Sequence, residues 1–174
     1  FRDSLVFKML REEILPLIVY QRVKENDPTI RVWSAGCSSG EEPYSVAMIL
    51  HDLLGDAFDQ FKVEIVASDI DDEMLAAAEV GKYLPRQVVG VPKDILSTYF
   101  TYQDGLYSVR DDIKRMVRLK RIDLFSETAG KGFDMVLCRN VVIYFNREMQ
   151  ERLYMKFLSS LRPGGYFVMG NTET

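Results

Sequence analysis

Two adjacent glutamates, Glu41 and Glu42, follow a turn of small residues and stand at the start of an apolar helical pattern. The turn runs from Gly36 to Gly40, and its two glycines permit positive φ angles or a close approach of the backbone to a ligand. Strand, glycine turn and helix form the opening unit of a doubly wound sheet, which binds ligands at the carboxyl ends of its strands. We therefore predict a small-molecule site at this turn.

The residues of the turn favour a cationic ligand. They match neither the G-x-G-x-x-G dinucleotide pattern nor the G-x-x-x-x-G-K-[ST] phosphate pattern. Two acidic residues suit the positive end of a helix dipole, but they would compete with a pyrophosphate placed there. A ligand with an amino group and no phosphate fits better, and S-adenosylmethionine is one such ligand. The alternative is an ordinary structural turn, because an acidic helix start is common in proteins.

Further carboxylates stand where other predicted strands end. Asp69 closes a strand over 62–68, and an acid at that place usually accepts hydrogen bonds from a ribose diol. The alternative role for Asp69 is a helix cap, which Asp71 fills better. Asp123 follows a strand over 117–122, where it either accepts from an adenine amino group or caps its loop. Both roles stay open for Asp123.

The sequence lacks the motifs of histidine-based and metal-based catalysis. It contains neither G-x-S-x-G nor H-E-x-x-H, and its single histidine, His51, has no cysteine or histidine neighbours. No metal site is therefore predicted. Methyl transfer to a carboxylate needs no general base, because the nucleophile is already ionised at neutral pH. A nicotinamide oxidoreductase is disfavoured by the missing dinucleotide pattern.

The elements that position these residues alternate between strands and helices along the chain. Successive strand–helix units imply parallel strands joined by right-handed crossovers. The predicted fold is an α/β, doubly wound, mostly parallel sheet with a small antiparallel β insertion over about residues 93–116. The predicted strands of the main sheet are 30–35, 62–68, 117–122, 133–138 and 166–169. Their ends, which converge on one edge of the sheet, carry Gly36–Gly40, Asp69, Asp123, Asn140 and Gly170–Asn171.

Local signals predict how several elements begin and end. Pro16 should end or kink the first helix of the chain. Asp71 and Asn146 are predicted N-caps of two later helices. Residues 100–109 are predicted to form a hairpin, and Pro163-Gly164-Gly165 is a strong turn signal before the last strand.

Composition limits the class of function. The 174 residues suit one domain, and 47% hydrophobic residues are ample for a core. The net charge of −4 argues against nucleic acid as a partner, although Arg110–Arg121 is a locally basic strip. No apolar run approaches the length needed to span a membrane, so no membrane insertion is predicted. Cys37 and Cys138 form no disulfide framework, which predicts a reduced, cytoplasmic compartment.

Four blocks of sequence occur in a distinctive order, namely RVWSAGCSSGEEPYSVAM, VASDIDDEMLAAAEVGKY, FDMVLCRNVVIYFN and LRPGGYFVMGNTET. Together with FRDSLVFKMLREEIL at the start, they resemble the consecutive signature blocks of the chemotaxis receptor methyltransferases, the CheR family. The resemblance covers nearly the whole chain and implies a sheet of the S-adenosylmethionine-dependent methyltransferase type. It also implies methylation of glutamate side chains on the cytoplasmic helices of methyl-accepting chemoreceptors. The products would be glutamyl methyl esters and S-adenosylhomocysteine.

The resemblance implies roles for single residues. Arg2 and Tyr144 match the family residues beside the transferred methyl group, where the arginine orients the substrate carboxylate. Taken alone, Arg2 would be a solvated charge and Tyr144 a core aromatic. Glu42 would bind the amino group of the cofactor, and Asp69 would bind its ribose. The remaining residues of the predicted cofactor site are Gly36 in the turn, Asp123 and Leu124 against the adenine, and Asn140 and Val141 along the pocket.

The sequence departs from the family pattern at both ends and in the hairpin. Residues 1–28 are predicted as a linker and leading helix without the family's N-terminal domain. Residues 29–174 are predicted as a methyltransferase domain that lacks its closing strands. The short turn Gln103-Asp104-Gly105 predicts that the protein does not use a receptor's C-terminal peptide as a tether. The alternative function is a non-catalytic S-adenosylmethionine-binding module in a signalling protein.

Overall fold

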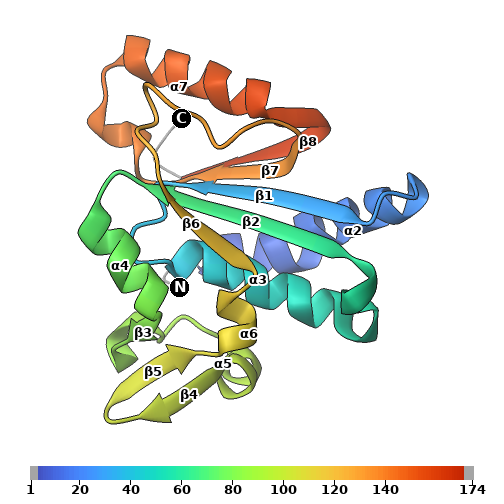
Figure 1. The fold of residues 1–174 in the computed structure, drawn as a ribbon, viewed down its shortest axis with the longest axis vertical. Coiled ribbons are helices and arrows are strands. Elements are labelled where there is room, and N and C mark those ends of the chain that lie inside the picture. The colour runs from blue at the N-terminus through green and yellow to red at the C-terminus, as the bar shows by residue number, and fades with distance from the viewer. Residues whose placement is uncertain (1–3, 171–174) are drawn as a thin grey trace.

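The computed structural model describes residues 4–170, which form a five-stranded parallel sheet and a separate three-stranded antiparallel sheet (Figure 1). The strands of the parallel sheet are β1 (Thr29–Ala35), β2 (Lys62–Asp69), β6 (Val117–Arg121), β7 (Phe133–Cys138) and β8 (Leu161–Met169). They lie in the order β6-β2-β1-β7-β8. The predicted α/β class with a doubly wound parallel sheet and an antiparallel insertion is confirmed.

The strand order reverses between β1 and β7. From β1 the chain moves outward to β2 and β6, and it then returns to β7 on the other side of β1. Trp33 of β1 pairs with Val66 of β2 on one side and with Val136 of β7 on the other. A doubly wound sheet opens a crevice at such a reversal, outside the carboxyl ends of its strands.

Helices cover both faces of the parallel sheet, as Figure 1 shows. Their bounds are α1 Ser4–Met9, α2 Leu15–Lys24, α3 Glu41–Leu54, α4 Asp72–Val80, α5 Lys93–Tyr99, α6 Asp111–Lys114 and α7 Arg147–Ser160. Shorter helical turns are η1 Leu10–Ile14, η2 Gly55–Gln60, η3 Pro85–Gln87 and η4 Val142–Tyr144.

The alternation of side chains along β1 divides the core into two layers. Val32 belongs to the cluster that packs under α1, α2 and α3, whereas Trp33 belongs to the cluster under α7. The ring of Trp33 lies edge-on to Phe157 of α7 with the ring centroids 5.4 Å apart. Because successive residues of a strand face opposite sides, β1 contributes side chains to the core on both faces of the sheet.

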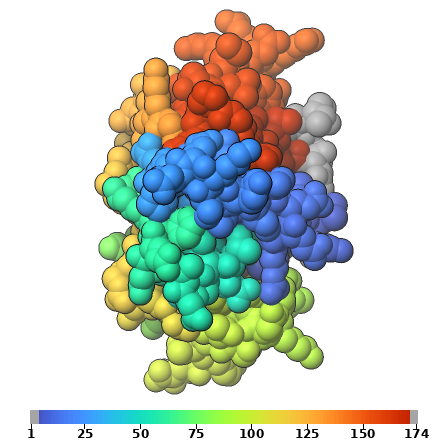
Figure 2. Space-filling model, turned by 90° about the vertical axis from the view of Figure 1, so that its right-hand side faces the viewer, coloured from blue at the N-terminus to red at the C-terminus, as the bar shows by residue number. Residues whose placement is uncertain are grey.

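The antiparallel sheet has the order β3-β5-β4, with strands β3 (Lys82–Tyr83), β4 (Phe100–Gln103) and β5 (Leu106–Val109). The predicted hairpin is confirmed, and its two turn residues, Asp104 and Gly105, both have positive φ angles. Strand β3 was not predicted from the sequence, because two residues are too short to show an alternating pattern. The sheet therefore begins at Lys82 rather than near residue 93. Seen from the amino edge of the parallel sheet, this part of the chain forms the lower end of the molecule (Figure 2).

Two predicted caps are confirmed. The carboxylate of Asp71 accepts from the backbone N–H groups of Glu73 and Met74, at 2.9 and 3.3 Å. The side chain of Asn146 accepts from the N–H of Met149 at 3.0 Å. These contacts satisfy backbone donors that have no partner inside the first helical turn.

Two of the proline-containing boundaries that the sequence predicts differ in the structure, at Pro16 and at Pro163. Pro16 does not end the first helix, because a π-helical turn over Leu10–Ile14 comes before it and α2 continues through it. Pro163-Gly164-Gly165 does not precede the last strand but lies within β8. The ladder with β7 shifts register at this point, since Phe133 pairs with Leu161 and Met135 pairs with Tyr166. A bulge of this kind tolerates a proline and a glycine inside a strand.

Within residues 4–170, no helix is both long enough and apolar enough to cross a lipid bilayer.

Candidate functional site

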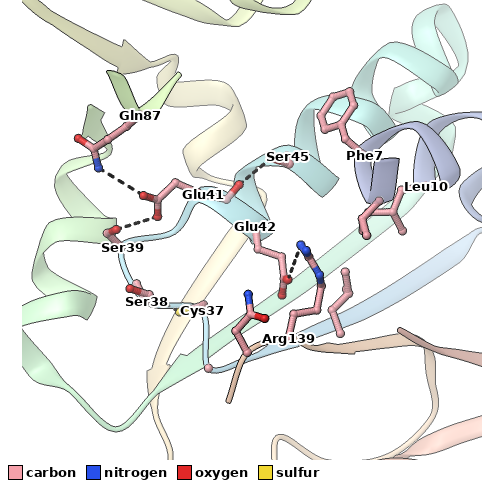
Figure 3. Close-up of a pocket in the computed structure, with 14 residues that line it drawn as sticks. Phe7, Leu10, Cys37, Ser38, Ser39, Glu41, Glu42, Ser45, Gln87 and Arg139 are labelled. Atoms are coloured by element: carbon pink, nitrogen blue, oxygen red, sulfur yellow. Dashed lines mark hydrogen bonds and ion pairs between the residues drawn. The ribbon is translucent and has the colours of Figure 1, made fainter. Parts of the chain in front are cut away.

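A pocket of about 730 Å³ lies at the carboxyl edge of the parallel sheet, beside the reversal of strand order. Its walls come from α1, η1, the turn between β1 and α3, the start of α3, η3, and the residues after β7 (Figure 3). The volume is that of a site for a cofactor-sized molecule. The lining residues labelled in Figure 3 are Phe7, Leu10, Cys37, Ser38, Ser39, Glu41, Glu42, Ser45, Gln87 and Arg139.

The turn between β1 and α3 is tied to the end of β2. The backbone N–H groups of Gly36 and Cys37 both donate to the carbonyl oxygen of Ser68, at 2.7 and 2.9 Å. Gly36 has a φ angle of +75°, and a Cβ atom at this position would collide with the Cγ2 atom of Val141. Gly36 is therefore required both by its conformation and by the close approach of the residue that follows β7.

The carboxylate of Glu42 lies in the pocket wall between Ser34 of β1 and Arg139, which follows β7. Its Oε1 atom accepts a hydrogen bond of 2.7 Å from the Oγ atom of Ser34, a buried residue of β1. Its Oε2 atom lies 3.7 Å from the Nη1 atom of Arg139, which follows β7. A negative and a positive group therefore lie side by side in this wall of the pocket (Figure 3).

Glu41 provides a second carboxylate at the pocket wall, beside Glu42. Its Oε2 atom accepts from the Oγ atom of Ser39 at 2.7 Å, and its Oε1 atom lies 3.4 Å from the Nε2 atom of Gln87. The Oγ atom of Ser45 donates to the backbone carbonyl of Glu41 one turn later. These contacts keep the side chain beside the turn (Figure 3).

The turn lies in a negative electrostatic environment. Burial, together with the charges of Asp69, Glu42 and Glu41, raises the pKa of the Cys37 thiol to about 12. Three carboxylates therefore act on one buried side chain in the pocket lining. Arg139 brings a positive charge, so the acidic groups of this wall outnumber the basic one. Such a field favours a ligand that carries positive charge.

Asp69 stands beside the pocket and supports the turn. Its Oδ2 atom accepts from the N–H of Ser38 at 2.8 Å, and its Oδ1 atom accepts from the N–H of Asp71 at 3.1 Å. Ser38 has a φ angle of +48°, a conformation that is uncommon for a residue with a side chain. A carboxylate has about four acceptor positions, so Asp69 retains capacity for ligand hydroxyl groups.

Asp123 caps its own loop. Its Oδ1 atom accepts from the N–H of Phe125 at 2.9 Å, and this hydrogen bond lowers the pKa of the carboxyl. The following residue, Leu124, is half-buried. The loop is held from α7, because the ammonium of Lys156 donates to the carbonyl oxygens of Leu124 and Glu127. The capping role of Asp123 is thus confirmed, and its contact with an adenine stays a prediction.

The residues after β7 divide between the pocket and the surface. Asn140 lines the pocket and has a φ angle of +59°. Val141 packs against Gly36, as described above. Tyr144 lies in η4 with 79% of its surface exposed and is not part of the lining formed by residues 4–170. Arg2 lies outside the described residues.

Several lining residues were not predicted from the sequence. Arg139 follows β7 immediately before Asn140, so its place at a strand end was the available signal. Phe7 and Leu10 look like ordinary apolar residues of a helix, and Gln87 lies in the short helical turn η3, far along the chain. Their role depends on tertiary packing, which local patterns do not report.

The basic strip lies on a different surface. A second hollow, of about 800 Å³, runs beside β6, and its lining includes the acidic residues Asp72, Glu79 and Asp111 as well as five basic residues, Lys114, Arg115, Arg118, Lys120 and Arg121. Lys114 pairs with Asp111 at 2.9 Å, and Arg121 pairs with Asp72 at 3.5 Å. Among residues 4–170, no group of three or more histidine, cysteine or acidic side chains could hold a metal ion.

Comparison with known proteins places these features in a family. The whole chain, residues 1–174, matches the model described as "CheR methyltransferase, SAM binding domain". A chemotaxis protein methyltransferase of Borreliella burgdorferi is 38% identical over 100% of this chain and 62% of its own length. A chemotaxis protein methyltransferase of Listeria monocytogenes is 35% identical over 99% of this chain and 63% of its own length.

The similarity to solved structures is weaker. A glycopeptide N-methyltransferase complexed with sinefungin superposes with a TM-score of 0.49 and 15% identity, over 86% of this chain and 50% of its own. This similarity is too low to support a conclusion about function. The chain spans less than two thirds of the length of the two chemotaxis methyltransferases that it matches.

Proposed function

Because the chain belongs to the CheR methyltransferase family and corresponds to its S-adenosylmethionine-binding domain, we propose that it methylates glutamate side chains on the cytoplasmic helices of chemoreceptors. The product would be a γ-glutamyl methyl ester, and the protein would act in the cytoplasm during chemotactic adaptation. The receptor, the reaction and the compartment are all part of this proposal, since the matched relatives extend well beyond this chain.

The pocket fits the cofactor of this family in charge and in donor set. Glu42 would accept hydrogen bonds from the ammonium of the methionine moiety, because its carboxylate is already fixed by Ser34. The guanidinium of Arg139 lies in the same wall and suits the carboxylate of that moiety. Asp69 would accept from ribose hydroxyl groups, as acids at this place in doubly wound sheets do.

The chemistry requires little of the protein besides binding and orientation. When bound, S-adenosylmethionine supplies a methyl group on a positively charged sulfonium centre. A glutamate carboxylate is ionised at neutral pH and can accept that methyl group without a general base. The apolar side chains of Phe7, Leu10 and Leu137 line the pocket and would exclude water from the reacting groups. Proximity and orientation then provide the main rate enhancement.

The observation that carries the proposal is the carboxylate of Glu42, held inside an acidic pocket at the reversal of strand order. A pyrophosphate would be repelled there, whereas an amino group and a sulfonium would be attracted. The surface exposure of Tyr144 favours the alternative, a non-catalytic S-adenosylmethionine-binding module, because a catalytic aromatic should face the reacting groups.

Transfer of a radiolabelled methyl group separates the two functions. The protein is incubated with labelled S-adenosylmethionine and the cytoplasmic fragment of a chemoreceptor, and base-labile label in the receptor is counted. The proposal predicts label that is released as methanol by mild base and is lost when the acceptor glutamates are replaced by alanine. No label in the receptor, from a protein that binds S-adenosylhomocysteine, would support the module instead.

A further inference from the structure

The antiparallel sheet and η3 both contact the segment between β1 and α3 that lines the pocket. From these contacts we propose that Tyr83 and Gln87 are positioning residues of the pocket, which hold the turn over 36–40 in the shape that binds the cofactor. The inference rests on the proposed function in one respect, namely that the pocket binds S-adenosylmethionine and S-adenosylhomocysteine. The contact of Tyr83 with Ser39 connects the antiparallel sheet to the segment that follows β1 of the parallel sheet.

Tyr83 reaches the turn from β3. Its hydroxyl donates a hydrogen bond of 2.8 Å to the backbone carbonyl of Ser39, although the two residues are 44 positions apart in the sequence. Only 1% of the surface of Tyr83 is exposed, and burial raises the pKa of its hydroxyl. The hydroxyl is therefore protonated at any physiological pH and acts as a permanent donor to the turn.

Gln87 reaches the turn from η3. Its Oε1 atom accepts from the backbone N–H of Leu84 at 2.9 Å, which fixes the orientation of the side-chain amide. The Nε2 atom then lies 3.4 Å from the Oε1 atom of Glu41 in the pocket wall (Figure 3). The other carboxylate oxygen of Glu41 accepts from the Oγ atom of Ser39 in the turn. The carboxylate of Glu41 therefore connects Gln87 of η3 to the turn.

The turn needs such support because part of it is held in an unfavourable conformation. Ser38 adopts a φ angle of +48° without being a glycine, a conformation that persists only when neighbouring groups hold it. Asp69 holds the N–H of Ser38 from the parallel sheet. Tyr83 holds the adjacent carbonyl of Ser39 from the antiparallel sheet.

The contacts also connect the cofactor pocket to the rest of the antiparallel sheet. Tyr83 pairs with Tyr107 of β5 in the backbone ladder, and β5 pairs in turn with β4. A ligand that fixes the turn should therefore stabilise this sheet, and loosening of the sheet should weaken the ligand. Binding free energies coupled in this way are reciprocal.

The experiment compares two buried tyrosines, Tyr83 of β3 and Tyr99 of α5. Tyr83→Phe removes the donor to the turn, whereas Tyr99→Phe removes a hydroxyl that lies 3.1 Å from the Nδ1 atom of His51. Neither Tyr99 nor His51 belongs to the pocket lining formed by residues 4–170. Both side chains are at most 2% exposed, so the two variants should lose similar stability. Calorimetry measures the affinity for S-adenosylhomocysteine, and hydrogen exchange measures amide protection over residues 36–41 in the free protein.

We expect Tyr83→Phe to weaken S-adenosylhomocysteine binding roughly three- to tenfold and to speed exchange over the turn, because one hydrogen bond to the turn is lost. Tyr99→Phe should change neither. Gln87→Leu should weaken binding as well, while leaving the contact between Tyr83 and Ser39 in place. Equal affinities and equal exchange over the turn in Tyr83→Phe and Tyr99→Phe would overturn the inference.

Failure of the proposed function would look different. A wild-type protein that does not bind S-adenosylhomocysteine would contradict the function, and the exchange comparison would still decide whether Tyr83 holds the turn. Faster exchange over residues 36–41 in Tyr83→Phe alone would support the positioning role, and unchanged exchange would contradict it.

Discussion

The hydroxyl of Ser34 donates to the carboxylate of Glu42 across 2.7 Å, and this contact joins the carboxyl end of strand β1 to the first turn of helix α3. Ser34 is fully buried, so it offers the carboxylate one fixed partner that water cannot replace. The other carboxylate oxygen lies 3.7 Å from Arg139, beyond β7. One side chain is thus oriented from both strands that flank the reversal of strand order.

Replacement of Asp69 tests the ribose contact. Asp69→Ala should weaken cofactor binding by roughly 1–3 kcal/mol, because both the ribose and the N–H of Ser38 would lose an acceptor. The matched control is Asp71→Ala, which removes the N-cap of α4 two residues away and should lower stability without a comparable loss of affinity. Calorimetry with S-adenosylhomocysteine and urea unfolding measure the two effects. Equal affinities of the two variants would argue against a ribose contact.

Replacement of Gly36 tests the close approach of Val141, which follows β7, to the turn. Gly36→Ala should lower the free energy of unfolding more than Gly55→Ala, although both glycines have positive φ angles, +75° and +47°. A Cβ atom on Gly36 would meet Val141, whereas a Cβ atom on Gly55 would meet nothing within 4 Å. The difference should be about 1–3 kcal/mol, the usual cost of overpacking. Urea unfolding of the two variants provides the measurement, and equal losses would contradict this account.

The acidic environment of Cys37 predicts slow alkylation. Since burial and the neighbouring carboxylates raise the pKa of its thiol from 9.0 to about 12, the thiolate fraction at pH 9 should be lower than in the unfolded chain by a factor on the order of 10²–10³. Iodoacetamide labelling followed by mass spectrometry, with and without urea, measures the difference. Labelling of native Cys37 as fast as in urea would show that the thiol is not protected.

The same shift predicts a dependence of stability on pH. A raised pKa means that the folded state keeps its proton longer than the unfolded state does. The stability present below pH 9 should therefore decrease as the pH rises toward 12. Cys37→Ala should show a smaller decrease over this range than the wild-type protein, when both are compared by urea unfolding. Identical alkaline profiles of the two proteins would contradict the prediction.

Lys156 is expected to stabilise the loop that would face the adenine. Its ammonium donates to the carbonyl oxygens of Leu124 and Glu127, and burial lowers its pKa. Lys156→Met should reduce the free energy of unfolding by about 1–3 kcal/mol, because two loop carbonyls lose a charged donor. Arg152→Met, an exposed position on the same helix, should be nearly neutral. Thermal or urea unfolding distinguishes the two, and a neutral Lys156→Met would refute this role.

Much of the fold was predictable because it depends on local signals. Continuous apolar runs marked the buried strands, and Asp71 and Asn146 marked helix starts through their capping side chains. The parts that local signals missed depend on pairing partners elsewhere in the chain. The two-residue strand β3 exists only as a partner of β5, and the bulge at Pro163-Gly164-Gly165 is set by the register with β7.

The candidate site was predictable where strand ends carry a polar residue. Glu42 and Asn140 line the pocket, and Asp69 supports the turn at its side. Gln87 escaped prediction because it reaches the pocket only through the packing of η3 against the turn. Tyr144 was predicted beside the methyl group by resemblance alone, and its exposed position in η4 is not explained by that role.

The most direct test of the acidic pocket compares two ligands on one variant. S-adenosylhomocysteine carries the ammonium that Glu42 would bind, whereas 5′-methylthioadenosine has the same nucleoside without the amino acid moiety. Glu42→Gln should weaken S-adenosylhomocysteine binding roughly ten- to hundredfold, because a charged hydrogen bond is lost, and should leave 5′-methylthioadenosine binding unchanged. Calorimetry gives all four affinities. Equal losses for both ligands, or no loss for S-adenosylhomocysteine, would contradict the assignment of Glu42 to the ammonium of the cofactor.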